Sequence, residues 1–316
     1  DLPGRKGDAT VSGGDGMTPP KHIAASVRQR LLNRAKSGRR PFNELLQYYA
    51  MERFLYRLSQ SVHVDRFILK GALMLKVRRS PQLRPTMDID MLGMASNQEA
   101  DIIAQIKDIL TVDVEADGLA FDPASIQVER ITEEADYEGI RIRFLGALGS
   151  ARINMQIDIG FGDIVYPEPE EADLPTMLNS PAPRLLCYSR ESSIAEKFEA
   201  MVKLGMLNSR MEDFYDIWLL SRQFDFGGAR LTEAIRLTLK RRGTELPAEI
   251  DAFTEHFIEA KQAQWAAFRK RLGQEQVPIS FKEIAASVDS FLSPIVAGFS
   301  PGKEIPTNWA APGPWA

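Results

Sequence analysis

The stretch "RPTMDIDMLG" (residues 84–93) places two aspartates, Asp88 and Asp90, one residue apart inside an apolar run. The alternating pattern predicts a β-strand, in which residues i and i+2 point to the same face. Two carboxylates held that close repel each other unless a cation lies between them. Mg²⁺ suits this position because it is usually bound by one or two carboxylates together with substrate phosphates. The motif alone is a weak signal, since two exposed aspartates on an edge strand are a common alternative.

A glycine precedes this strand in "ILKGALML" (residues 68–75), where an apolar strand pattern changes to a helical one at Gly71. A glycine at such a junction lets the backbone approach a phosphate group, and a helix N-terminus offers unpaired N–H groups to an anion. The stretch therefore predicts a phosphate-binding loop just upstream of the two aspartates.

Further charged residues follow in a fixed order. Asp158 lies between isoleucines in "QIDIGFGD" (residues 156–163), and an aspartate in an apolar strand needs a partner, for which a shared metal is one option. Downstream, Lys197 and the pair Asp213 and Asp216 lie in helical patterns. A solvated helix lysine and a structural ion pair, for example between Asp213 and Arg210, are the simpler alternatives.

The wider pattern predicts an α/β (α+β) fold in which N-terminal helices precede a mixed sheet and a helical domain follows it. Strands are expected at 66–70, 86–93, 125–134, 139–148 and 151–161, and a helix at 97–110. Ser192 or Ser193 is the expected N-cap of the first helix of the C-terminal half, with Glu196 completing a capping box. The predicted divisions are a disordered tail (1–20), the sheet domain with its N-terminal helices (21–185), the helical domain (186–298) and an irregular tail (299–316).

Bulk composition narrows the class of protein. A hydrophobic content of 44%, 26% charged residues and a net charge of −4 are typical of a globular protein and argue against a globally basic nucleic-acid binder. The single cysteine, Cys187, excludes an internal disulfide, and the three histidines are too scattered for a zinc site. No apolar run reaches the length of a membrane span, so we expect a cytoplasmic protein with no membrane partner.

The segments "LKGALML…RPTMDIDMLG", "QIDIGFGD" and "AEKFEAMVKLGMLNSRMEDFYDIWLL" together resemble the AbiEii/AbiGii (MenA-type) nucleotidyltransferases, the toxins of type IV toxin–antitoxin and abortive-infection systems. The resemblance covers roughly residues 40–225 and implies a nucleotidyltransferase-like sheet. It implies catalytic roles for Asp88, Asp90, Asp158, Lys197 and Asp213, of which the first three would be the metal ligands. It implies nucleotide binding by Lys70, Gly71, Ala72, Arg84, Thr86 and Lys197. Two positions depart from the family pattern: Ala72 stands where many relatives have Gly or Ser, and Glu212 where many have a basic residue.

The expected reaction is transfer of a nucleotide from a nucleoside triphosphate, with Mg²⁺ or Mn²⁺, to an RNA acceptor. The resemblance points to the 3′ end of tRNA, whose modification would block translation, and to a cognate antitoxin encoded nearby that need not touch this chain. Arg78, Arg79 and Arg84 are further candidates for phosphate contacts. Two alternatives stay open: a protein hydroxyl as acceptor, and a catalytically inert nucleotidyltransferase-like module that binds a partner.

Overall fold

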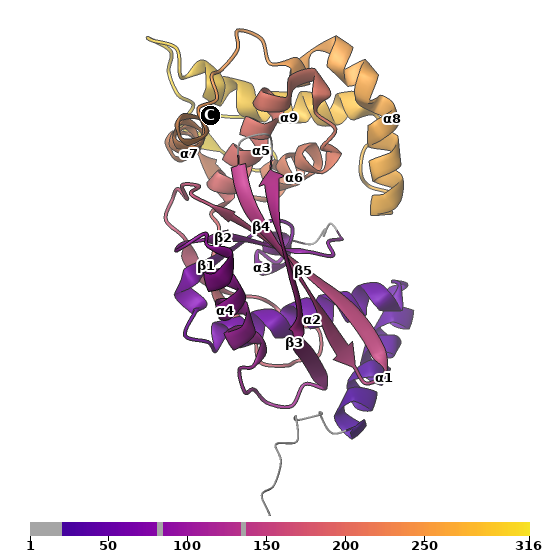
Figure 1. Cartoon of the computed structure of the whole chain (residues 1–316). Helices are drawn as coiled ribbons and strands as arrows, with labels where there is room; N and C mark the ends of the chain where they lie inside the picture. Colours follow the sequence, from indigo (N-terminus) through magenta and orange to yellow (C-terminus); the bar gives the residue numbers. More distant parts are fainter. Residues whose placement is uncertain (1–20, 81–84, 134–136) are drawn as a thin grey trace, which may run out of the picture.

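The computed structural model describes residues 21–80, 85–133 and 137–316, so the predicted tail (1–20) and Arg84 lie outside the described residues. Figure 1 shows two halves: a twisted sheet with its helices, and a group of helices stacked above one end of the sheet. The buried apolar side chains likewise form two clusters, one built from residues before 189 and one mainly from residues after 193.

The sheet within the described ranges has seven strands in the order β3-β4-β5-β2-β1-β7-β6. Their bounds are β1 (Phe67–Lys70), β2 (Ile89–Gly93), β3 (Leu119–Glu133), β4 (Tyr137–Leu148), β5 (Ala151–Phe161), β6 (Glu170–Asp173) and β7 (Arg184–Cys187). β2 runs parallel to β5 and β1 parallel to β7, whereas the other neighbouring pairs are antiparallel. The predicted mixed sheet is confirmed, but β6 and β7 were not predicted.

The long strands have one apolar and one polar face. In β5, buried Ile153, Met155 and Ile157 alternate with the exposed or half-buried Arg152, Asn154 and Gln156. The apolar face packs against the N-terminal helices: the ring of Phe54 lies 5.6 Å from that of Phe144 on β4. The opposite face of β3, β4 and β5 is therefore left for polar side chains, among them Arg141 and Asp158.

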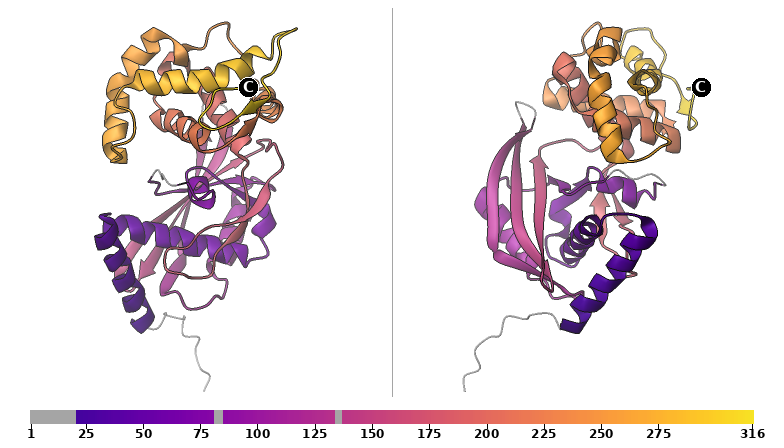
Figure 2. Two further views of the ribbon diagram at one scale, coloured as in Figure 1. Left: turned by 180° about the vertical axis from the view of Figure 1, so that it is seen from behind. Right: turned by 90° about the vertical axis from the view of Figure 1, so that its right-hand side faces the viewer.

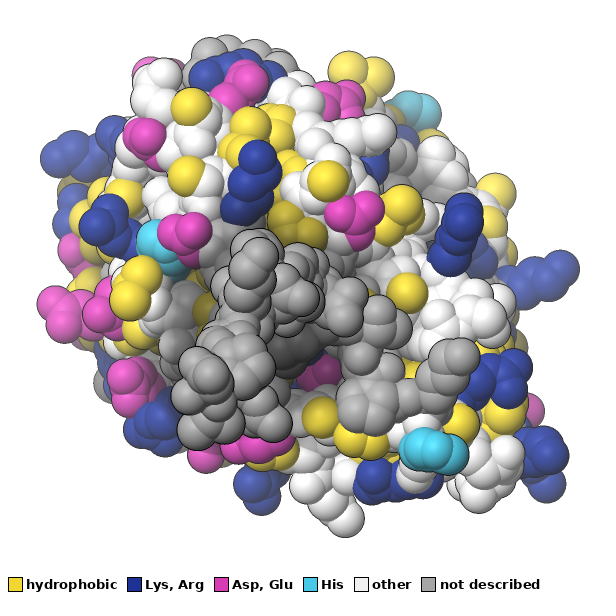
Figure 3. All heavy atoms as spheres, turned by 60° about the horizontal axis from the view of Figure 1, so that its bottom comes forward, with side chains coloured by type: hydrophobic (Ala, Val, Ile, Leu, Met, Phe, Trp, Pro, Cys, Tyr) yellow, Lys and Arg dark blue, Asp and Glu magenta, His cyan; other side chains and the backbone are white. Residues whose placement is uncertain are grey.

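The helices account for the rest of the two halves (Figure 2). Their bounds are α1 (Lys21–Gly38), α2 (Phe42–Ser59), α3 (Leu73–Val77), α4 (Glu99–Leu110), α5 (Arg190–Leu204), α6 (Met211–Gln223), α7 (Gly228–Arg242), α8 (Glu255–Leu272) and α9 (Phe281–Ala297). None of the helices in the described ranges is both long and apolar enough to cross a membrane. On the face seen from the bottom of Figure 1, basic side chains are interspersed with acidic ones rather than gathered into one patch (Figure 3).

The predicted N-cap of α5 was wrong. Helix α5 starts at Arg190, and its N-cap is Ser189, whose Oγ accepts a hydrogen bond from the Ser192 N–H at 3.0 Å. The hydroxyl of Ser193 instead donates to the Ser189 carbonyl. The segment 299–316, expected to be irregular, contains β9 (Asn308–Trp309), which pairs with β8 (Phe226–Gly227), because buried Trp309 packs against Phe291 of α9 at 4.8 Å between ring centroids.

Candidate active site

The candidate site begins as a row of four charged side chains across the centre of the sheet. Asp90 on β2 is the register partner of Lys70 on β1 and of Asp158 on β5, and Asp158 is in turn the partner of Arg141 on β4. Register partners on neighbouring strands project from the same face of a sheet. The fold therefore brings Asp90 and Asp158 together across two strands that are far apart in the sequence.

The predicted phosphate-loop glycine is required for a reason that the sequence did not reveal. Gly71 has a φ of +73°, and a Cβ added there would lie 2.0 Å from Oδ2 of Asp90. A side chain at this position would both strain the backbone and displace the carboxylate. Gly71 thus allows Asp90 to lie directly against the loop, and α3, which follows the loop, has only five residues.

Both residues line a cleft of about 590 Å³ between the sheet and the helices α5, α6 and α7. Five of the predicted site residues meet there: Lys70, Gly71, Asp90, Lys197 and Asp213. The cleft is rich in cations, since it is also lined by Arg78, Arg130, Arg141, Arg210 and Arg242. A concentration of positive charge opposite a carboxylate suits a polyanionic ligand that brings a metal cation with it.

Lys197 is held at the cleft by two carboxylates of α6. Its Nζ donates to Asp213 Oδ1 at 2.6 Å and lies 3.0 Å from Asp216 Oδ2. The two aspartates are three residues apart on one face of the helix, as predicted. The partner of the Asp213 carboxylate is Lys197 and not Arg210, which was the alternative. The following Tyr215 and Trp218 are buried among apolar side chains, as core residues.

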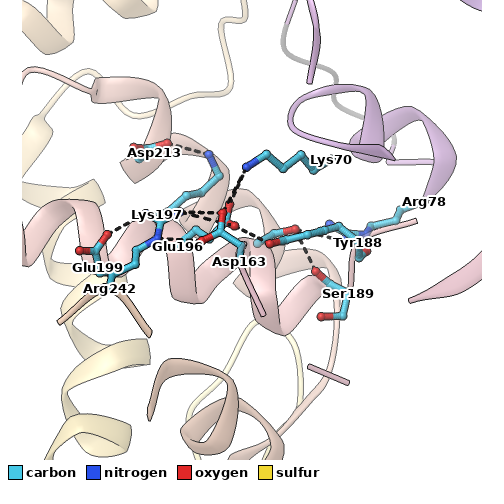
Figure 4. A network of polar contacts seen from close by, with 11 residues as sticks. Lys70, Arg78, Asp163, Tyr188, Ser189, Glu196, Lys197, Glu199, Asp213 and Arg242 are labelled. Carbon is cyan, nitrogen blue, oxygen red and sulfur yellow. Dashed lines mark hydrogen bonds and ion pairs between the residues drawn. The ribbon is translucent and has the colours of Figure 1, made fainter. Parts of the chain in front are cut away.

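A second charged network lies behind Lys70 (Figure 4). The Lys70 ammonium is 3.7 Å from Asp163 and 3.5 Å from Glu196, and Arg242 of α7 bonds Asp163 at 3.1 Å. The hydroxyl of Tyr188 donates to Glu196. These contacts join the loop after β5, the end of β7 and two helices, and they fix the ammonium of Lys70 relative to Asp90.

The pKa values of the two carboxylates in that network, Glu196 and Asp163, are shifted in opposite directions. Burial raises the pKa of Glu196 to about 7; Lys70 lowers it, and the nearby Asp163 carboxylate raises it further. Burial would also raise the pKa of Asp163, but Lys70 and Arg242 outweigh burial and lower it to about 2. Near neutral pH, Asp163 is therefore charged while Glu196 is partly protonated. The two groups together place less negative charge beside the Lys70 ammonium than two ionised carboxylates would.

Arg78, one of the arginines predicted to contact phosphates, is at the wall of the cleft without a carboxylate partner in the described part of the chain. Its Nη2 donates to the Tyr188 carbonyl at 2.9 Å and to Ser193 Oγ at 3.4 Å. Burial, and to a lesser extent Arg190, lowers the pKa of Arg78 to about 10. Arg78 is half-buried, and an accompanying anion stabilises a guanidinium that has lost part of its water, so this side chain suits a phosphate group. Arg79, its neighbour, is exposed.

Asp158 lies in a strand, β5, as predicted, but its carboxylate already forms an ion pair with Arg141. Arg141 donates to both of its oxygens, at 2.8 and 2.7 Å. Asp88 lies in the bend before β2 and not in the strand, since β2 begins at Ile89, so the strand predicted over this stretch starts too early. The carboxylate of Asp88 makes no hydrogen bond or ion pair with another described residue, and Asp88 does not line the cleft that Asp90 lines. Across the described ranges, no group of three or more His, Cys, Asp or Glu side chains is arranged to hold a metal ion. Mg²⁺ is usually bound by one or two carboxylates together with substrate phosphates, so a metal at Asp88 and Asp90 would need a bound nucleotide to complete its ligands.

The remaining predicted residues lie at the edges of the site. Ala72 is buried at the start of α3 and does not line the cleft. Thr86 Oγ1 accepts from the Asp88 N–H at 3.4 Å and donates to the Asp88 carbonyl at 3.3 Å, so it orders the turn before β2. Sequence reasoning assigned no site role to Asp163, Glu196 or Arg242, because their partners come from segments distant in the chain.

The family model described as "Nucleotidyl transferase AbiEii toxin, Type IV TA system" matches residues 53–287. The chain belongs to this family of toxins and is a nucleotidyltransferase, as the resemblance implied.

Two solved structures have a low similarity to the chain. A candidate nucleotidyltransferase from H. pylori is 12% identical over 79% of this chain and 96% of its own, with a TM-score of 0.46. JHP933 from Helicobacter pylori is 11% identical over 81% of this chain and 98% of its own, with a TM-score of 0.39. No curated protein sequence matches the chain.

Proposed function

We propose that this chain transfers a nucleoside monophosphate from a nucleoside triphosphate to an RNA acceptor, with the 3′ end of tRNA as the acceptor, and so blocks translation in the cytoplasm. A cognate antitoxin, as the toxin family implies, would counter it. The observation that supports the reaction best is the position of Asp90, which lies against Gly71 and faces the cations of one cleft.

In this proposal the triphosphate lies in the cationic cleft. Lys197, oriented by Asp213 and Asp216, neutralises phosphate charge, and Arg78 offers a fixed guanidinium to a second phosphate. Mg²⁺ or Mn²⁺ held by Asp88 and Asp90 would stabilise charge at the reacting phosphate when bound. Positioning and charge stabilisation of this kind account for most of the catalysis of phosphate-transfer enzymes.

The chemical step joins the acceptor to the α-phosphorus. An acceptor hydroxyl oxygen attacks the α-phosphorus, the bond from that phosphorus to the oxygen bridging to the β-phosphate breaks, and pyrophosphate leaves. The hydroxyl proton passes to Asp158 as the third carboxylate. The ion pair between Asp158 and Arg141 has to open for this role, and Arg141 lines the same cleft, where incoming phosphates offer it another anionic partner.

The test is incubation of the full chain with Mg²⁺, total tRNA and each of the four nucleoside triphosphates labelled at the α-phosphate. Label in RNA with the wild type, and none with Asp90→Ala, is the expected result. Label in a protein band would replace RNA with a protein hydroxyl as the acceptor. No label in RNA or protein with any nucleotide, from a folded wild-type chain, would overturn the proposal and favour the inert binding module.

A further inference from the structure

A second cleft meets the first one at the two aspartates. It has a volume of about 820 Å³, and Asp88 lines it, whereas Asp90 lines the cationic cleft. Residues i and i+2 of an extended chain are about 7 Å apart. A molecule in the second cleft would therefore end beside the group bound in the first, which is the arrangement that an acceptor and a donor need.

The second cleft is bordered by α2 as well as by the long strands, and residues from both faces of β4 and β5 line it. Its walls come from the first turn of α2 (Asn43, Leu46, Gln47), the turn before β2 (Met87, Asp88) and residues of β3, β4 and β5 (Ser125, Gln127, Arg143, Phe144, Leu145, Arg152, Ile153, Asn154, Met155, Gln156). Register pairs Arg143 with Gln127 on one side and Gln156 on the other.

The lining combines three kinds of group that single-stranded RNA requires. Four side-chain amides, those of Asn43, Gln127, Asn154 and Gln156, can bond to the edges of unstacked bases. Arg143 and Arg152 can contact phosphates, and Asp88 is the sole acidic residue among those that line the cleft. Met87 and Leu145 are apolar and yet 50% and 40% exposed, so they offer surfaces on which a base can lie.

Several of these groups are available to a ligand. The side chains of Asn43, Gln127, Asn154 and Arg152 make no hydrogen bond or ion pair with any other residue that the structure describes. Gln156 is oriented rather than free, because its Oε1 accepts from Arg143 Nε at 3.1 Å. The cleft thus has both fixed and adaptable polar groups, as expected of a recognition site.

The geometry favours RNA over a peptide. A peptide would be held most firmly by adding a strand to β5 along the edge that faces away from β4. Within the described ranges, β2 pairs with that edge only from Ile157 onward. At that edge, however, Gln47 Nε2 already donates to the Asn154 carbonyl at 2.9 Å and to the Met87 carbonyl at 3.2 Å. Gln47 is buried, so this bond blocks backbone pairing at the place where a peptide acceptor would have to dock.

We propose that this second cleft binds the last unpaired nucleotides of the RNA acceptor and directs the terminal hydroxyl to Asp88. The inference rests on the proposed function, since it names the subsite for the acceptor of that reaction. Arg152 and Arg143 hold the backbone, and the amides of Gln127, Asn154 and Gln156 face the bases.

The experiment measures binding without turnover. A single-stranded RNA oligonucleotide labelled with fluorescein at its 5′ end is titrated into the full chain, and fluorescence anisotropy gives the Kd. The variants are Arg152→Glu and Asn154→Leu, both at exposed positions. The matched control is Arg66→Glu, at an exposed arginine at the opposite end of β1 from Lys70 that lines neither cleft. Binding of a nucleoside triphosphate with Mg²⁺ is measured on the same samples.

Arg152→Glu should weaken RNA binding by tenfold or more, Asn154→Leu should weaken it and change the preferred terminal base, and neither should change nucleotide binding. For Arg152→Gln, the slope of log Kd against log salt should fall by about 0.7, the value for one lost contact to a single strand. Equal effects of Arg152→Glu and Arg66→Glu, or unchanged RNA binding in the first two variants, would overturn the inference. So would label transfer to protein with no RNA binding. If RNA binds as expected but no label is transferred, the proposed function fails while the subsite stands.

Discussion

The substitution Gly71→Ala tests whether the lack of a side chain at residue 71 is what leaves room for the carboxylate of Asp90. The added Cβ would lie 2.0 Å from Asp90 Oδ2, and ordinary contacts begin at 3.4 Å, so the carboxylate must move by more than 1 Å. A misplacement of about 1 Å can cost about 100-fold in rate. The positive φ of +73° adds about 1–2 kcal/mol of strain for a residue with a Cβ. We therefore expect kcat/KM for label transfer to fall about 100-fold, while the chain still folds.

The matched control is Gly273→Ala, because Gly273 has a φ of +67° at the end of α8 and nothing within 4 Å of its added Cβ. This variant carries the strain without the clash. It should lose about 1–2 kcal/mol of unfolding free energy, measured by urea denaturation, and keep its activity. If Gly71→Ala transfers label at a rate within about threefold of the wild type, well short of the expected loss, the proposed contact does not matter for catalysis. An equal activity loss in Gly273→Ala would assign the effect to backbone strain.

Three further predictions follow from the charged contacts. Lys197→Met should lower kcat/KM by about 100-fold or more, because a fixed cation at the phosphates is lost. Asp213→Asn should lower kcat/KM less, since Asp216 still holds the Lys197 ammonium. Steady-state kinetics of both variants check these two expectations. Burial raises the pKa of Glu196 to about 7, so the stability that this group contributes is complete below pH 4.5 and falls as the pH rises through 7. In Glu196→Gln the thermal midpoint should therefore depend less on pH over that window, and an unchanged pH profile would contradict the shift. Arg141→Gln should cost about 2 kcal/mol in urea denaturation, less than the ~3–5 kcal/mol of a fully buried pair because Arg141 is 29% exposed; a neutral effect would contradict the importance of that ion pair.

The sequence predicted the parts of the site that depend on local patterns. Alternation placed β5 at its observed bounds and predicted that Asp90 lies in a strand, although β2 begins one residue after Asp88. Helical spacing predicted that Asp213 and Asp216 share a face, and both now bond Lys197. These features repeat every two to four residues, so a short window of sequence contains the whole signal.

The sequence could not predict contacts between distant segments. The pairing of Asp158 with Arg141 depends on the register of β4 and β5, and a shift of one residue would point Arg141 to the other face. Asp163, Glu196 and Arg242 meet only because α5 and α7 pack beside the end of β5. The close approach of Gly71 to Asp90 likewise depends on how two antiparallel strands align, and a glycine in a sequence does not reveal what lies against it.

The position of the transferred label tests the central claim most directly. The full chain is incubated with Mg²⁺ and tRNA in parallel reactions that contain the same nucleoside triphosphate labelled at the α- or the γ-phosphate. A nucleotidyltransferase places the α-label in the RNA and releases all of the reacted γ-label as pyrophosphate. Appearance of the γ-label in the RNA, or its release as free phosphate without α-label in any acceptor, would contradict the account.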